Sequence, residues 1–299
     1  MTATKATAHR SGYVAIVGRP NAGKSTLLNA LIGQKISITS RRPQTTRQNI
    51  AGILTGPNAQ LVFLDTPGFQ MQYRTGLTKA MDRGIKNALS EAHVALWLID
   101  VTDNEHKDDE LFARLKDASS VVIAINKIDR IDNKNKVLEH IQAWDAAYLP
   151  KAIVPISAQK KLQLDTLIEA LTPLLPQQEF LYPESDVTTA SVRGLAAEMI
   201  REKLFRQLGQ ELPYSTAVEI ETFEEKPALT RIRAVILVDK PGQKAIVIGK
   251  GGEKLKEIGT AARHDIEKLV GGKVFLELWV KVKQSWADDR RTLDRLGLS

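Results

Sequence analysis

The feature that most constrains the fold of this chain is the string GRPNAGKS at residues 18–25. It matches the phosphate-binding pattern G-x-x-x-x-G-K-[ST], it follows the apolar run Tyr13 to Val17, and it opens a segment of helical spacing that ends near Gly33. A strand, a glycine turn and a helix in this order direct backbone N–H groups and a helix dipole at a phosphate. The alternative is a glycine-rich turn that binds nothing, but such a string arises by chance in only about one chain of this length in a hundred.

The pattern gives the positions of this loop their expected roles. Lys24 reaches the β- and γ-phosphates of a nucleotide, and Ser25 ligates a magnesium ion. The loop positions expected to bind the nucleotide are Gly18, Asn21, Ala22, Gly23, Lys24, Ser25 and Thr26.

The first part of the chain, from residue 13 to about residue 178, alternates apolar runs with amphipathic runs. This alternation is typical of βα units around a mostly parallel sheet, whose ligands bind at the carboxyl ends of the strands. The runs expected to form buried strands are Tyr13 to Val17, Gln60 to Leu64, Val94 to Asp100, Val121 to Asn126 and Ala152 to Pro155.

Two further motifs directly follow expected strands. In the motif DTPG, Asp65 would hold magnesium, usually through water, and Gly68 would offer its N–H to the γ-phosphate. In the motif NKID, the carboxylate of Asp129 can accept hydrogen bonds from N1–H and from the exocyclic amine of guanine, whereas adenine presents an acceptor at N1. Guanine is therefore the expected base. The positions expected around it are Asn126, Lys127, Asp129, Ser157 and Ala158.

These four elements, in this order, resemble the GTPases of the translation-factor and Ras-like superclass. The resemblance implies a threonine that joins the magnesium shell, and Thr46 is the expected residue, with Thr45 as the alternative. It implies Lys24, Thr46 and Gly68 as the catalytic set, and it implies Ser25, Thr46 and Asp65 as magnesium ligands. GTP and GDP are the expected nucleotides.

One position departs from the Ras pattern. Phe69 stands where Ras-like enzymes have the glutamine that orients the attacking water, so hydrolysis is expected to be slow unless a partner or a cation completes the site. A hydrophobic residue here is typical of a subgroup that includes Era-like proteins. Asn21 matches the position that binds K⁺ in potassium-stimulated relatives, and the alternative is an asparagine that only stabilises the turn.

The loop after the first helix is basic. Lys35, Arg41, Arg42 and Arg47 lie between Gly33 and Ile50 without an acidic residue. The loop either contacts RNA phosphates or is a solvated basic loop.

The second part of the chain follows a segment rich in Pro, Gln and Glu that is expected to be a linker. Helix, strand, strand, helix, a G-x-x-G loop, helix and strand then succeed one another, with the loop at Gly249 to Gly252. This order resembles a type II KH domain, which clamps about four nucleotides of single-stranded RNA. The apolar residues Ile246, Ile248, Leu255 and Ile258 are expected to line its groove, and the alternative for them is core packing. The residues expected to contact RNA are Lys244, Ile248, Gly249, Lys250, Gly251, Gly252, Lys254, Lys256 and Lys273.

Charge favours the same part of the chain as the RNA site. The whole chain carries a formal net charge of +7, and residues 240–283 hold ten Lys and Arg against five Asp and Glu. The absence of cysteine excludes disulfides, thiolate metal sites and cysteine nucleophiles. A polar start and the lack of an apolar run of about 18 residues predict a cytosolic protein.

The combined prediction is an α/β P-loop GTPase domain followed by a smaller α+β type II KH domain. The expected boundaries are a disordered N-terminus at 1–10, the GTPase domain at 11–178, the linker at 179–190 and the KH domain at 191–299. This pairing resembles the Era-like GTPases. It implies a cytoplasmic protein that binds small-subunit ribosomal RNA near its 3′ end, assists assembly of the 30S subunit, and in some members associates peripherally with the inner membrane. No DNA partner is expected.

Two other functions fit parts of the sequence. One is a constitutive RNA-binding module in which the nucleotide is only a structural element. The other is a metabolic kinase, which the base-reading motif and the lack of an evident acceptor pocket disfavour.

Overall fold

The computed structural model describes residues 9–40, 45–69, 75–102, 109–115, 120–131, 134–209 and 212–298. Arg41 and Arg42 of the basic loop, and residues 1–8 of the expected disordered N-terminus, lie outside the described residues. The chain forms two compact units. The first comprises Met1–Ser37, Gln48–Met71 and Asp82–Thr189, and the second comprises Ile38–Arg47, Gln72–Met81 and Ala190–Ser299.

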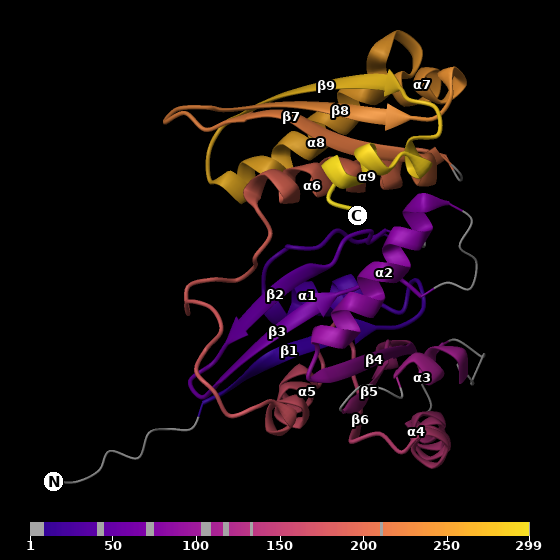
Figure 1. Cartoon of the computed structure of the whole chain (residues 1–299), viewed down its shortest axis with the longest axis vertical. Coiled ribbons are helices and arrows are strands. Elements are labelled where there is room, and N and C mark those ends of the chain that lie inside the picture. The colour runs from indigo at the N-terminus through magenta and orange to yellow at the C-terminus, as the bar shows by residue number, and fades with distance from the viewer. Residues whose placement is uncertain are drawn as a thin grey trace, which may run out of the picture. The chain divides into compact units, whose positions relative to one another are not determined.

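A six-stranded sheet organises the first unit, with the strand order β2-β3-β1-β4-β5-β6 (Figure 1). All neighbouring strands are parallel except β2, which runs antiparallel to β3. The strands are β1 (Arg10–Val17), β2 (Ile50–Thr55), β3 (Ala59–Asp65), β4 (Val94–Asp100), β5 (Val121–Asn126) and β6 (Ala152–Pro155). The helices are α1 (Lys24–Ile32), α2 (Gly76–Glu91), α3 (Asp109–Leu115), α4 (Lys134–Tyr148) and α5 (Leu164–Leu171).

Both faces of this sheet are buried, as expected for a parallel sheet. On β1, Val14 and Ile16 belong to a core shared with α1 and α5. Their neighbours Ala15 and Val17 belong to a second core, to which Trp97, α2, α3 and α4 contribute. Side chains alternate along a strand, so each strand contributes to both cores. Helices cover both faces of the sheet, and the loops at the carboxyl ends of the strands are where a ligand can bind.

The predicted linker lies against the first unit. The backbone N–H of Ile53 in β2 donates to the carbonyl of Val187 at 2.9 Å, and the side-chain oxygen of Gln60 accepts from the N–H groups of Leu181 and Tyr182 at 2.8 and 3.0 Å. Residues 181–187 are therefore hydrogen-bonded to β2 and β3 of this sheet.

The second unit contains a three-stranded sheet in the order β7-β8-β9 (Figure 1). Strands β7 and β8 are antiparallel, and β8 and β9 are parallel. The elements are α6 (Val192–Gln207), β7 (Thr216–Glu224), β8 (Thr230–Val238), α7 (Pro241–Ile248), α8 (Glu253–Val270), β9 (Val274–Val282) and α9 (Arg290–Arg295). The predicted order of elements is confirmed.

Each face of this sheet has a different cover. Residues of α6 and α8, among them Ile200 and Ile258, form the main core with one face. On the other face, Val235 and Leu237 of β8 pack with Trp286 and Leu293 from the C-terminal segment. Within the described residues, no helix is long and apolar enough to cross a bilayer.

Candidate nucleotide site and nucleic-acid groove

The phosphate-binding loop connects β1 to α1 in a conformation that requires glycine. Gly23 has φ +103, and a Cβ atom there would lie 2.4 Å from Nδ2 of Asn126. A Cβ atom at Gly18 would lie 2.4 Å from the carbonyl oxygen of Leu98. Because larger side chains would collide with these neighbours, the two glycines let the loop pack directly on the ends of β4 and β5.

Lys24 is a buried cation at the start of α1. Its side chain is 6% exposed, and its ammonium donates to the carbonyl oxygens of Gly18 and Arg19 at 3.0 Å each. Burial lowers the pKa of Lys24 to about 8, although the nearby charge of Asp65 opposes this shift. The shift corresponds to about 3 kcal/mol of cost for keeping the ammonium charged, which an anionic ligand would offset.

This pKa predicts how nucleotide affinity depends on pH. Bound phosphates stabilise the ammonium and raise the pKa of Lys24 above its value of about 8. Below that value Lys24 is already protonated and affinity should be level. Above it, binding must take up a proton, so affinity should fall by up to about tenfold per pH unit. Calorimetry with GTP from about pH 7 to pH 9, in buffers of different ionisation enthalpy, measures both the affinity and the proton uptake.

A Lys24→Arg variant is the control, because a guanidinium at the same position keeps its proton to higher pH than an ammonium does. If proton uptake above pH 8 were the same in this variant as in the unmodified protein, Lys24 would not be the titrating group.

Two of the three residues predicted to hold magnesium, Ser25 and Asp65, are in contact. The hydroxyl of Ser25 donates to Oδ2 of Asp65 at 2.7 Å, and the hydroxyl of Ser37 donates to the same oxygen at 2.8 Å. Asp65 is the last residue of β3 and is fully buried. Hydroxyl and carboxylate oxygens are donors that suit Mg²⁺, which keeps several waters and phosphate oxygens in its shell. The donor set therefore fits a magnesium ion, and sequence reasoning missed Ser37.

The threonines proposed for the magnesium shell belong to the second unit. Thr45 and Thr46 are both buried, and the carbonyl of Thr45 accepts a hydrogen bond from the Arg201 guanidinium. Next to them, the guanidinium of Arg47 donates to the carbonyl of Thr216 at 2.7 Å, and burial lowers its pKa to about 9. Arg47 of the predicted basic loop is thus a buried packing residue here, and the magnesium role of Thr46 stays a prediction.

The segment after β3 contacts the phosphate-binding loop. A Cβ atom at Gly68 would lie 2.9 Å from Cα of Pro20, and the N–H of Phe69 donates to the carbonyl of Gly18 at 3.1 Å. The ring of Phe69 is buried, with the guanidinium of Arg114 at 4.6 Å from its centroid. Phe69 therefore offers no polar group to an attacking water.

The loops predicted to read the base are joined to the phosphate-binding loop. The side chain of Asn126 donates to the carbonyl of Ala22 at 2.8 Å and accepts from the N–H of Ala158 at 2.9 Å. The hydroxyl of Ser157 donates to Oδ1 of Asp129 at 2.5 Å. One asparagine thus ties together the loops after β1, β5 and β6.

Lys127 has a second set of contacts in this region. Its ammonium donates to the carbonyl of Asn21 at 2.8 Å and forms an ion pair with Asp100 at the end of β4. Burial raises the pKa of Asp100, but hydrogen bonds from Lys127 and Thr102 outweigh this effect and leave the pKa below its ordinary value. Sequence reasoning missed Asp100, although its place at the end of a buried strand is a usable signal.

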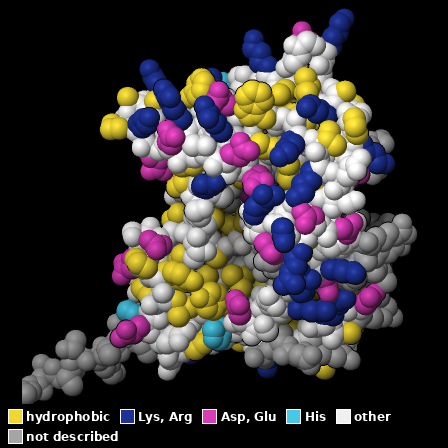
Figure 2. Space-filling model, turned by 45° about the horizontal axis from the view of Figure 1, so that its top comes forward, with side chains coloured by type: hydrophobic (Ala, Val, Ile, Leu, Met, Phe, Trp, Pro, Cys, Tyr) yellow, Lys and Arg dark blue, Asp and Glu magenta, His cyan; other side chains and the backbone are white. Residues whose placement is uncertain are grey.

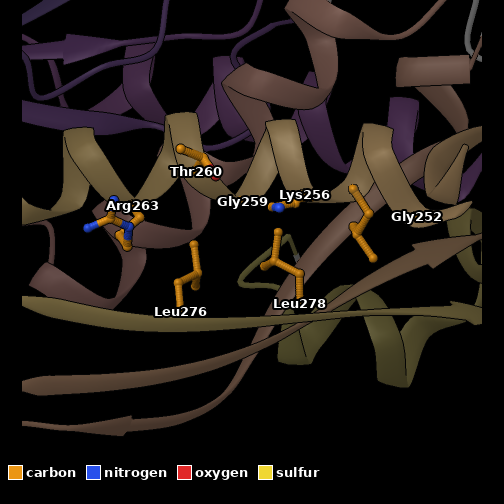
Figure 3. A pocket seen from close by; sticks show the side chains of 8 residues that line it. Gly252, Lys256, Gly259, Thr260, Arg263, Leu276 and Leu278 are labelled. Carbon is orange, nitrogen blue, oxygen red and sulfur yellow. The ribbon is translucent and has the colours of Figure 1, made fainter.

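A groove of about 340 Å³ lies between α8 and β9 in the second unit (Figure 3). Leu276 and Leu278 of β9 point toward α8, where Gly259 and Arg263 lie on the facing side (Figure 3). The lining residues are Gly252, Leu255, Lys256, Gly259, Thr260, Arg263, Leu276 and Leu278. An apolar floor with cations on one wall suits a single-stranded nucleic acid.

Two of the nine predicted RNA residues line this groove. Gly252 and Lys256 line it, and the G-x-x-G loop that contains Lys250 joins α7 to α8, with φ +73 at Gly249, +59 at Gly251 and +83 at Gly252. Lys244 and Ile248 lie on α7, Lys254 lies in α8 and forms an ion pair with Glu257 at 3.2 Å, and Lys273 precedes β9.

The predicted apolar lining is only partly right. Leu255 lines the groove, whereas Ile258 is fully buried in the core, as the alternative of core packing predicts. Ile246 is 58% exposed and Ile248 packs against the core. Sequence reasoning missed Gly259, Thr260, Arg263, Leu276 and Leu278.

Comparisons with known proteins cover nearly the whole chain. The model of a 50S ribosome-binding GTPase family matches residues 13–127, and the model of a KH domain matches residues 211–287. The chain is 49% identical to GTPase Era of Pseudomonas aeruginosa over 290 residues, which cover 96% of this chain and 95% of that protein. It is 47% identical to GTPase Era of Xanthomonas oryzae over 290 residues, covering 97% of each.

Solved structures agree with these relatives. An Aquifex aeolicus Era variant bound to GDP·AlF4⁻ superimposes with a TM-score of 0.92 at 40% identity, covering 97% of this chain and 99% of that chain. Era in complex with MgGDPNP and nucleotides 1506–1542 of 16S ribosomal RNA gives the same score, identity and coverage.

Proposed function

This chain belongs to the Era family of GTPases, and from that membership we propose that it is a GTP-hydrolysing switch that binds small-subunit ribosomal RNA near its 3′ end and assists assembly of the 30S subunit. The observation that carries the proposal is the presence of a nucleotide site and a nucleic-acid groove in the same chain. Lys24 is buried under a phosphate-binding loop that Asn126 ties to the base-reading loops, and a G-x-x-G loop borders a groove with basic residues.

The nucleotide site supports a guanine nucleotide with magnesium. Ser25 and Asp65 would hold the ion, which supplies charge neutralisation at the β- and γ-phosphates when bound. Lys24 would neutralise the same phosphates, Gly68 would offer its N–H, and Thr46 would complete the magnesium shell. Because Phe69 is buried and apolar, intrinsic hydrolysis should be slow, and K⁺ at Asn21 is the proposed means of completing the site.

The groove between α8 and β9 is the proposed RNA site. Lys250, Lys254 and Lys256 would attract phosphates in a way that salt weakens, with a slope of about −0.7 per phosphate contact for single strands. We place the protein in the cytoplasm, bound to the 30S subunit, with peripheral membrane association as a further proposal from the family resemblance.

The test of the RNA site is the double substitution Lys250→Asp and Gly251→Asp. A Cβ atom at Gly251 meets nothing within 4 Å, and aspartate tolerates its φ of +59, so the change acts through charge rather than through a clash. RNA affinity should fall by roughly 10- to 100-fold, because two negative charges replace a cation beside the phosphates. Fluorescence anisotropy with a labelled 3′-terminal rRNA oligomer at several salt concentrations measures the loss.

The other end of α8 offers a matched control. Gly271 has φ +65 and equally open surroundings, and Lys268 lies in the last turn of α8, so Lys268→Asp with Gly271→Asp makes the same charge change away from the G-x-x-G loop. The control should bind RNA nearly as well as the unmodified protein. Equal affinity of the loop variant and the unmodified protein would refute the clamp, and both variants should retain GTP binding.

A constitutive RNA-binding module is the second candidate. It is distinguished by RNA affinity measured with GDP, with GTP and with a non-hydrolysable analogue. Equal affinities would rule out direct coupling between the nucleotide and RNA, whereas different affinities would support the switch.

A further inference from the structure

Strand β9 presents different residues on its two sides. Leu276 and Leu278 point into the groove below α8 (Figure 3). Because successive side chains of a strand alternate between faces, Phe275 and Trp279 lie on the opposite face of the sheet. Phe275 is 49% exposed and Trp279 is 62% exposed. Exposing two aromatic rings on one strand leaves apolar surface in water, which core packing does not explain.

The neighbours of these rings are defined by the register of β8 and β9. Arg231 pairs with Phe275, Arg233 pairs with Glu277, and Val235 pairs with Trp279. The guanidinium of Arg233 donates to Glu277 at 2.8 Å. An ion-paired guanidinium thus lies between the two aromatic positions, and another cation lies beside Phe275.

The C-terminal segment covers only part of this face. Trp286 and Leu293 bury Val235 of β8, but Trp279, which pairs with Val235 on β9, stays exposed. The C-terminal segment therefore covers β8 and not β9 at this position. On the face of the second unit that Figure 2 presents, exposed hydrophobic side chains lie among Lys and Arg side chains. By the register of β8 and β9, the uncovered strip consists of Phe275 and Trp279 with Arg231 and the Arg233–Glu277 ion pair beside them.

This combination suits unpaired bases. Flat aromatic rings on an open sheet stack bases of any sequence, and guanidinium planes stack in the same way. Phe275 and Trp279 are four residues apart, about 13 Å along the strand, so each can take a separate base. A membrane surface fits less well, because the charged Arg233–Glu277 pair lies between the two rings, so inserting both rings into lipid would bury these charges, whereas separate bases can stack on the rings and leave the pair in water.

We propose that Trp279 and Phe275 form a second RNA-contacting surface on the open face of β9. It is a stacking platform for unpaired bases, and the adjacent nucleotides of the same RNA molecule occupy the groove. The proposal rests on the proposed function, since the groove supplies the first contact. The platform follows from the position of β9, the edge strand of the sheet, whose two sides carry the groove and the rings.

The natural tryptophans allow a direct test in the full chain. The chain has four tryptophans, and of these Trp97, Trp144 and Trp286 are buried at 1%, 5% and 1% exposure. Quenching of tryptophan fluorescence by acrylamide therefore reports mainly on Trp279. An oligomer of about ten nucleotides should quench this emission and shield it from acrylamide, whereas one of about four nucleotides should fill the groove and leave it accessible.

Variants measure the contribution of the platform. Trp279→Ala should weaken binding of the longer oligomer by roughly 5- to 150-fold, Trp279→Phe should restore most of it, and neither should change binding of the shorter oligomer. Leu149→Ala is the matched control, because Leu149 is an 81% exposed hydrophobic residue of the first unit. Circular dichroism checks that each variant is folded.

The failure of the platform is distinguishable from the failure of the proposed function. If labelled RNA binds, Trp279 stays accessible and Trp279→Ala binds as well as the unmodified protein, the platform is wrong while the groove remains. If neither oligomer binds, both proposals fail. Vesicles of phosphatidylserine and phosphatidylcholine are the third arm, and shielding of Trp279 by vesicles but not by RNA would assign the surface to lipid.

Discussion

Replacing Lys24 with alanine is expected to weaken GTP binding by about 2–5 kcal/mol, or roughly 30- to 5,000-fold, while RNA affinity measured without nucleotide stays unchanged. The ammonium is held at 3.0 Å from two carbonyl oxygens of the phosphate-binding loop, so it is already placed before a ligand arrives. Alanine removes the buried positive charge and leaves the phosphates with only backbone N–H groups and magnesium. Isothermal calorimetry with GTP and Mg²⁺ measures the effect directly.

Misfolding is the competing explanation for such a loss, and the buried charge argues against it. Keeping Lys24 protonated with a pKa of about 8 costs the folded protein free energy, so its removal offsets part of the cavity that alanine leaves. The melting temperature without nucleotide should therefore change little. A variant that kept the melting temperature and bound GTP as tightly as before would overturn the assignment of the phosphate site.

Strands of the first unit were predictable because of how parallel sheets are buried. Both faces of such a sheet are covered, so each strand is a continuous apolar run. The runs Val94 to Asp100, Val121 to Asn126 and Ala152 to Pro155 agree with β4, β5 and β6 at both ends. The P-loop, D-x-x-G and N-K-x-D motifs lie directly after such strands, so their gathering at one edge was predictable as well.

Strand β2 was not predicted, and its packing explains why. It is the antiparallel edge strand, and Gly52 interrupts its apolar run. A Cβ atom at Gly52 would lie 2.6 Å from Cδ1 of Leu28 on α1, so the glycine allows a close approach between the strand and the helix. Gly52 therefore reads as a strand breaker in the sequence, whereas in the fold it is needed for the packing of β2 against α1.

The groove was predictable in place but not in its full lining. The G-x-x-G loop is contiguous and indicates the site, whereas Gly259 and Arg263 share a face of α8 through a spacing of four residues, and Leu276 and Leu278 share a face of β9 through a spacing of two. In the sequence, residues with these spacings cannot be distinguished from core residues, because only the packing of α8 on β9 shows that they line a groove.

Long-range contacts also decide where residues 38–47 belong. Arg47 donates to the carbonyl groups of Pro213, Tyr214 and Thr216, more than 160 positions away in the chain, and its guanidinium lies 5.9 Å from the ring centroid of Phe205. No signal in the sequence indicates that Arg47, among the cations of the predicted basic loop, is buried in the second unit. Thr45 and Thr46 stand directly before Arg47 and belong to the same unit.

The largest change in specificity is expected from Asp129→Asn. In the unmodified protein the hydroxyl of Ser157 donates to Oδ1 of Asp129 at 2.5 Å, and in the proposed site the carboxylate would accept both guanine donors. Asparagine keeps the Oδ1 acceptor for N1–H and for Ser157, but its amide N–H then faces the exocyclic amine of guanine, and two donors cannot pair. Xanthine carries an oxygen at that position and would accept from the amide. Guanosine triphosphate should therefore lose roughly 10⁴-fold relative to xanthosine triphosphate.

Competition binding of the two nucleotides to the variant and to the unmodified protein measures this exchange. Asp129→Ala is the matched control, because it removes the acceptors without supplying a donor and should lose guanine without gaining xanthine. An Asp129→Asn variant that still preferred guanosine triphosphate would place the base away from Asp129. Asn126 bonds both to Ala22 of the phosphate-binding loop and to Ala158, so the loops after β1, β5 and β6 are fixed relative to one another. A base away from Asp129 would therefore remove the base site assigned to the ends of β5 and β6.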